Sequence, residues 1–223
     1  MLEGDPAATY ERLHQEGLAA NAQGKFAVGV EKFTAAYLLA QQAGDTPKQL
    51  TALNPRARAQ WGMGDFASAH ADLATALNLT EQTDTLQDEQ AAALSNMGRL
   101  RAAMALTYPR YQQAGLIRTT ALPLFQRAAS LLDGHPHIYY AYENAGHAAV
   151  AAAMAGERQQ AWQHIGAGMV AAFKKSEAPY DTDRRPVEIN RRGLIRFAAA
   201  AVLTIMTGDT PILASYARKK LMS

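Results

Sequence analysis

Hydrophobic residues recur along the chain at spacings of three and four, which is the period of an amphipathic α-helix. No stretch alternates apolar and polar residues with β-branched content, as a half-buried strand would. Alanine, leucine, glutamine, glutamate, arginine and methionine dominate the sequence, and all of them favour helices. The pattern therefore predicts an all-α chain. Three of its predicted apolar faces consist of Phe26, Val30, Phe33, Tyr37 and Ala40; of Phe66, Ala69, Leu73, Ala76 and Leu77; and of Ala161, Ile165, Gly168, Met169 and Ala172.

Glycine and proline mark the expected ends of these helices. In Gly44-Asp45-Thr46-Pro47 we expect the glycine to end one helix in the left-handed conformation, the threonine to cap the next helix, and the proline to take its first position. The same four residue types recur at 208–211, and Asp133-Gly134-His135-Pro136 is a further predicted stop. Asn54-Pro55 predicts the start of a helix or a kink, because proline lacks an N–H and clashes with the preceding turn.

A longer pattern repeats along the chain. A small residue, usually placed after a glycine-containing turn, is followed four positions later by a large apolar residue. The small residue would let the paired helix approach closely, and the large one would fill the gap between the two helices. The copies begin at Gly29, Ala69, Ala121 and Ala161, with a worn fifth copy at Leu213, so that the steps are 40, 52, 40 and 52 residues.

These residues resemble the tetratricopeptide repeat family, whose second-helix signature is a small residue followed, four positions later, by a large apolar one. The family's first-helix signature is matched well by Leu94-Ser95-Asn96-Met97-Gly98 and partly by Glu16-Gly17. The resemblance covers residues 10–221 and implies a single domain over 1–223. The implied fold is a right-handed superhelical solenoid of four to five antiparallel helix pairs, with 212–223 as a C-terminal capping helix.

The spacing departs from the family's repeat of 34 residues. The extra residues are expected in loops or in longer helices, with 78–88, 107–115 and 174–190 as the candidate segments. One of these segments contains the aromatic stretch Tyr108-Pro109-Arg110-Tyr111.

In that family the first helix of each pair lines a concave groove that binds peptides or protein segments. The resemblance therefore implies a groove with arginine and asparagine side chains for a peptide backbone or carboxylate. Trp61 is either an aromatic anchor for the partner or, as we favour, a packing residue between helices. The arginines could equally be solvated, Asn96 could bond a neighbouring helix, and the two histidines could be ordinary surface residues. The implied groove residues are His14, Asn21, Asn54, Arg58, Trp61, Asn96, Arg99, Glu143 and His147.

Composition narrows the function classes. The formal net charge is only +2 and there is no cysteine, so we expect no nucleic-acid partner, no disulfide and no thiolate metal site. The N-terminus lacks a signal-peptide pattern, and the most apolar stretch, 197–206, is too short to span a bilayer. We therefore expect a cytoplasmic protein without a membrane partner.

Candidate chemistry is sparse. His135 and His137 are metal-ligand types, but Pro136 between them disfavours shared coordination and no third ligand follows at fixed spacing. Glu143 and His147 share a helix face and could form an acid–base pair, although groove lining is the favoured interpretation. The mixed-charge run at 181–196 reads as a solvated loop and helix start. The sequence thus predicts no metal, no cofactor and no enzymatic activity.

Three functions remain open. The favoured hypothesis is a scaffold or adaptor that binds a protein or peptide in the groove, in a bacterial cytoplasm. The second is a regulatory sensor for a signalling peptide or small ligand, and the third is a metal-dependent enzyme built around His135, His137 and Glu143. Apolar residues of the last repeat leave homodimer formation as a further alternative.

Overall fold

The computed structural model describes residues 5–81, 86–132 and 138–174, and every regular element in these ranges is helical. The prediction of an all-α chain is confirmed for this part. The predicted capping helix at 212–223 and the fifth copy of the repeat lie outside the described residues. The elements are α1 (Pro6–Ala22), α2 (Phe26–Gln42), α3 (Thr46–Gly62), α4 (Phe66–Glu81), α5 (Gln87–Ala105), α6 (Arg110–Leu116), the π-helical η1 (Ile117–Ala121), α7 (Leu122–Leu131), α8 (Ile138–Met154) and α9 (Arg158–Lys174).

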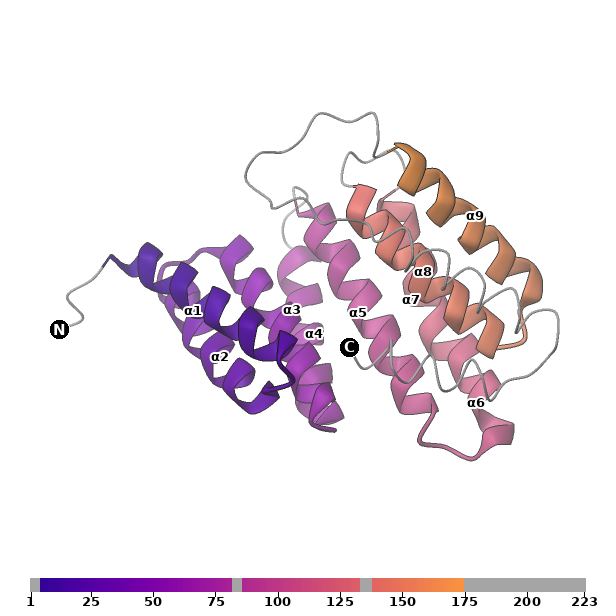
Figure 1. Cartoon of the computed structure of the whole chain (residues 1–223), viewed down its shortest axis with the longest axis horizontal. Helices are drawn as coiled ribbons and strands as arrows, with labels where there is room; N and C mark the ends of the chain where they lie inside the picture. Colours follow the sequence, from indigo (N-terminus) through magenta and orange to yellow (C-terminus); the bar gives the residue numbers. More distant parts are fainter. Residues whose placement is uncertain (1–4, 82–85, 133–137, 175–223) are drawn as a thin grey trace.

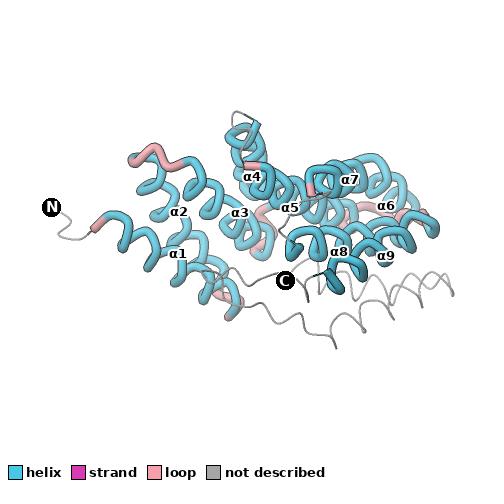
Figure 2. The backbone as a smooth tube through the Cα atoms, turned by 90° about the horizontal axis from the view of Figure 1, so that it is seen from above, coloured by secondary structure: helices cyan, strands magenta, loops and turns pink. Residues whose placement is uncertain are grey.

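Consecutive helices pack side by side along the long axis of the molecule (Figures 1 and 2). The first helices of successive pairs also contact one another, because α1 touches α3, α3 touches α5, and α5 touches α8. We call α1, α3, α5 and α8 the first-helix layer. Among the described helices, none is long and apolar enough to cross a membrane.

The tight connections between helices share one geometry. Gly24, Gly44, Gly64 and Gly156 all have φ between 67° and 85°, a conformation that only glycine adopts at little cost. In each case the residue after the glycine donates its N–H five positions back, at 2.9 Å, which closes a Schellman motif. The first three glycines are spaced by 20 residues, so each helix together with its turn occupies 20 residues in this part of the chain.

One prediction about the third helix is wrong, and one of the two alternatives for Asn54-Pro55 is excluded. Asp45, not Thr46, is its N-cap, because the Asp45 carboxylate accepts the N–H of Lys48 at 3.0 Å. Pro55 lies inside α3 and does not begin a helix. The carbonyl four residues earlier, that of Thr51, therefore loses its usual helical donor.

The small and large residues of the repeat pack as predicted. Phe33, Leu73 and Phe125 have no exposed surface, and Ile165 has 7%. Small residues on the partner helix make room for them: a Cβ built on Gly17 would lie 2.8 Å from the Phe33 ring. Close approach of the two helices of a pair therefore depends on these positions.

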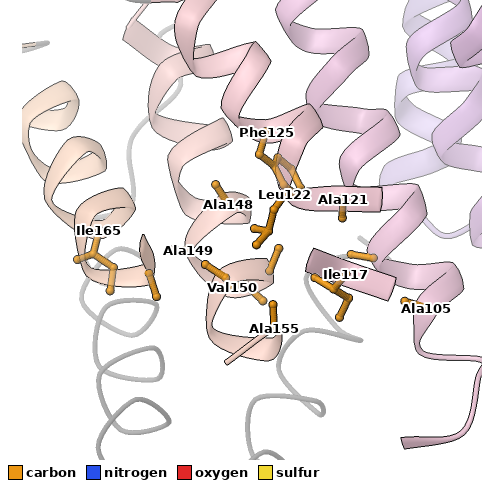
Figure 3. Close-up of a cluster of buried hydrophobic side chains, with 14 residues drawn as sticks. Ala105, Ile117, Ala121, Leu122, Phe125, Ala148, Ala149, Val150, Ala155 and Ile165 are labelled. Atoms are coloured by element: carbon orange, nitrogen blue, oxygen red, sulfur yellow. The ribbon is translucent and has the colours of Figure 1, made fainter. Parts of the chain in front are cut away.

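The core is continuous across the third and fourth pairs. Figure 3 shows Phe125, Leu122, Ala121 and Ile117 facing the alanine-rich side of α8, with Ile165 of α9 on the far side. Small residues on α8, including Ala148 and Ala149, are fully buried there. Their size allows α7 and α9 to pack closely on both sides of α8.

The third pair contains the extra residues that the longer step predicted. Residues 107–109 form a connection, but 110–115 belong to α6, which continues through the π-turn η1 into α7. The π-turn directly precedes α7, whose second residue is Pro123. Thr119 and Thr120 donate their hydroxyls to the carbonyls of Gly115 and Leu116 at 2.9 and 2.6 Å, which satisfies acceptors where the regular α-helical ladder is interrupted.

Candidate functional site

The α1 members of the predicted groove bind the backbone of α3. His14 Nε2 donates to the Thr51 carbonyl at 3.1 Å, which is the acceptor that Pro55 leaves without a helical donor. The His14 ring also stacks on Tyr10 and meets Phe33 edge-on, with ring centroids 5.8 and 5.7 Å away. His14 therefore supplies the hydrogen-bond donor that α3 lacks at Pro55, a role that the sequence pattern did not indicate.

Asn21, near the C-terminal end of α1, also bonds the backbone of α3. Its Nδ2 donates to the carbonyl of Pro55 at 3.1 Å. Its Oδ1 faces Gly29 of α2 so closely that a Cβ on that glycine would lie 2.1 Å away. The small residue at position 29 is thus required by a polar side chain as well as by helix packing.

Tyr10, which sequence reasoning missed, completes the contact between α1 and α3. Its hydroxyl donates to the Lys48 carbonyl at 2.8 Å and lies 2.6 Å from Thr51 Oγ1. Burial raises the pKa of the Tyr10 phenol, and the hydrogen bond with Thr51 lowers it by less. The phenol therefore stays protonated and able to donate.

The α3 and α5 members come together in one cluster. Asn96 Nδ2 donates to Asn54 Oδ1 at 3.1 Å, and Arg99 Nη1 donates to Asn96 Oδ1 at 3.4 Å. The Arg99 guanidinium lies over the Trp61 ring, 5.1 Å from its centroid. These four residues hold two adjacent helices of the first-helix layer together through polar and cation–π contacts.

For Trp61 the structure decides between the two alternatives, in favour of packing between helices. It is 1% exposed and belongs to a core cluster with Leu73 and Leu100. An anchor must present its ring to the partner, so the packing interpretation holds for Trp61. Arg99 is likewise buried, at 3% exposure, whereas Arg58 on α3 is only half-buried.

The α8 members are placed less completely. Glu143 lies in α8, but its side chain falls outside the described residues, as do His135 and His137. His147 is half-buried in the same helix.

The structure thus brings together Asn54, Trp61, Asn96 and Arg99, and separately joins His14 and Asn21 to α3. Within the described ranges, no group of three or more His, Asp or Glu side chains is arranged to hold a metal ion.

Comparison with solved structures reveals a likeness in fold. The chain is similar to the crystal structure of BtubC (BKLC) from P. vanneervenii, with a TM-score of 0.60 and 15% sequence identity. The match covers 85% of this chain and 72% of that chain. No family model matches the sequence, and no curated protein matches it. At this level of identity the likeness concerns the helical fold alone.

A largely buried ion pair between α3 and α4 has no counterpart among the predicted residues. Arg56 donates from Nε and Nη2 to the two carboxylate oxygens of Asp72, both at 2.7 Å, and also bonds Thr34 Oγ1 at 3.3 Å. The guanidinium lies 4.9 Å from the centroid of the Tyr37 ring. Three helices therefore converge on Arg56. The sequence contained a signal for this contact. Arg56 and Asp72 are 16 residues apart, as are Gly17 and Phe33, which meet between paired helices.

Two other polar contacts were also missed. Asn144 of α8 is 2% exposed and donates to the Phe125 carbonyl at 3.0 Å. His70 of α4 lies 2.7 Å from Arg101 of α5. Because arginine can only donate, His70 Nε2 must accept and the imidazole must be neutral. Burial, followed by the Arg101 charge, lowers the pKa of His70, which favours that neutral form.

Proposed function

We propose that the protein is a tetratricopeptide-like scaffold that binds a peptide or protein segment on its first-helix layer, without catalysing a reaction. The observation that carries this proposal is the layer itself, in which α1, α3, α5 and α8 contact one another in succession. Helical repeats stacked in this way present an extended surface suited to elongated ligands. The fold-level likeness to another helical protein supports the architecture, and a cytoplasmic location follows only as part of the same proposal.

Within this layer, the ligand-facing role falls on a smaller set of residues than the resemblance implies. His14, Asn21 and Trp61 are engaged in contacts between helices. Arg58 is half-buried in the middle of α3, one turn from Asn54 and three residues before Trp61, and it too interacts with another group of the chain. Its guanidinium is a planar donor for backbone carbonyls or carboxylates, and we assign it the main contact with the partner.

The test is a selection of short displayed peptides on the wild-type protein, followed by titration of each enriched peptide by fluorescence anisotropy. Arg58→Glu should weaken a class of these peptides roughly tenfold or more, as loss of a central charged contact does. The matched control is Arg158→Glu, which makes the same change at an exposed position at the start of α9. Circular dichroism confirms that both variants fold.

If no peptide is enriched, or if Arg58→Glu binds every enriched peptide as the wild type does, the first-helix layer is not the binding surface. Equal losses in Arg58→Glu and Arg158→Glu would also overturn the assignment, because they would indicate a nonspecific effect of net charge.

A further inference from the structure

The middle of the chain has a charge distribution that the overall balance conceals. Residues 90–132 contain five arginines and no lysine, aspartate or glutamate. This segment carries a formal charge of +5, whereas the chain as a whole carries +2, so the remainder carries −3. Carboxylates from the rest of the chain pair with part of this charge, so a partner would meet mainly the arginines that stay exposed.

Four of the five arginines already have structural tasks. Arg118 pairs with Glu157 and Arg127 with Glu81. Arg101 bonds His70, and Arg99 is buried over the Trp61 ring. Arg110 differs from them, because it is exposed and forms no ion pair with any residue of the described part of the chain.

Two exposed tyrosines flank this cation. Tyr111 is 82% exposed and Tyr108 is 48% exposed, which makes Tyr111 the most exposed of the large hydrophobic residues in the described ranges. We call Tyr108, Arg110 and Tyr111 the tyrosine–arginine patch. The patch lies where α5 connects to α6, at the lower edge of the molecule in Figure 1. Tyrosine and arginine are the residue types that contribute most often to binding energy at protein interfaces.

The backbone of the patch is fixed in place by local hydrogen bonds. Gln113 Nε2 donates to the carbonyls of Tyr108 and Leu106 at 2.8 and 3.4 Å. Thr107 Oγ1 donates to the Met104 carbonyl at 2.7 Å, and Pro109 fixes its own φ at the start of α6. A preorganised loop loses little conformational entropy on binding.

We propose that the tyrosine–arginine patch is a docking surface for an acidic segment of another protein, separate from the first-helix layer. Arg110 supplies an exposed cation for a carboxylate, and the two tyrosine rings supply apolar contact. A nucleic acid would need a row of free cations along its phosphates, whereas this patch has one. A symmetric pair of identical chains would bring the two Arg110 side chains together, which opposes self-association through this surface.

The test uses the peptides enriched on the wild-type protein and separates the two surfaces by variant. We expect one class of peptides, rich in aspartate and glutamate, to bind roughly tenfold more weakly to Arg110→Glu and to Tyr111→Ser. The same class should bind normally to Arg58→Glu and to Arg158→Glu. Replacing the acidic residues of such a peptide with lysine should restore part of its affinity for Arg110→Glu, because the charges are then reversed on both sides.

The proposal is overturned if no enriched peptide is sensitive to Arg110→Glu, or if the sensitive peptides are not acidic. It is also overturned if single-stranded oligouridylate displaces the peptides at equal concentration, which would assign the surface to nucleic acid. Since these peptides are defined by their indifference to Arg58→Glu, failure here leaves the test of the first-helix layer intact, and the converse also holds.

Discussion

Gly98 of α5 provides a sharp test of how the helix pairs are packed. A Cβ built on this glycine would lie 2.9 Å from Phe125 Cζ, and 3.0 and 3.1 Å from Cε1 and Cε2. Real Cβ atoms do not approach that closely, so Gly98→Ala must displace the phenyl ring. The ring has no exposed surface and packs in the same cluster as Ile117 and Leu122. It moves as a rigid unit, and its displacement disturbs the contact between α5 and α7.

Two opposing effects determine the size of the change. Alanine is favoured over glycine inside a helix by about 1 kcal/mol. Overpacking a buried site costs about 1–3 kcal/mol. Gly98→Ala should therefore leave the free energy of unfolding unchanged at best and lower it by about 2 kcal/mol at worst. Gly115→Ala is the matched control, because Gly115 is also helical and a Cβ there would meet nothing within 4 Å.

The free energies of unfolding come from urea denaturation followed by circular dichroism. We expect Gly115→Ala to be more stable than wild type, and the difference between the two variants to equal the overpacking cost of about 1–3 kcal/mol. Replacing the ring by a smaller side chain, in Phe125→Leu, should lower the free energy of unfolding less in the Gly98→Ala background than in wild type. If the two alanine variants were equally stable, the close packing of Phe125 on Gly98 would be refuted.

Two further predictions concern the histidines. His14→Phe keeps a ring but removes the donor to the Thr51 carbonyl, so it should lower the free energy of unfolding by about 1 kcal/mol. In a Pro55→Ala background the new backbone N–H replaces that donor, so the same change should cost less. A double-mutant cycle measured by urea denaturation that shows no coupling would contradict this role of His14. The pKa of His70 is lowered in the folded protein from its ordinary value of 6.5, so the unfolded chain takes up the proton first as the pH falls, and stability should decline from about pH 7.5 until the folded-state pKa is passed. His70→Gln keeps an acceptor for the α5 guanidinium and should reduce that decline, measured as unfolding midpoints across the pH range; an unchanged pH dependence would show that His70 is not responsible.

Much of the fold follows from local signals in the sequence. Apolar spacing identified the helices, and glycines such as Gly44 marked their ends because a left-handed turn requires that residue. The small and large positions of the repeat predicted which residues meet between paired helices, as Gly29 and Phe33 show by their burial. Each of these signals is contained within about one helix pair, so a single chain is enough to reveal it.

The candidate site was less predictable, because its contacts join residues that are 30 or more positions apart in the sequence. Asn96 reaches Asn54 across 42 residues and His14 reaches Thr51 across 37. A polar side chain on the first-helix layer looks the same in sequence whether it faces a ligand or a neighbouring helix. Only the structure shows that Trp61 is covered and that His14 serves a carbonyl left open by Pro55.

The longer step at the third pair explains where a new surface could arise without disturbing the core. None of the residues in α6 is buried, whereas Ala121 and Phe125, which carry the repeat, are fully buried in η1 and α7. The additional residues therefore extend the second helix of the pair beyond its packed part. Leu116 still packs against the core cluster, but the exposed positions of α6 add surface only, so substitutions there avoid the packing constraint found at Gly98. Selection for a partner could consequently act on Tyr108 and Tyr111 while the helix pairs stay unchanged.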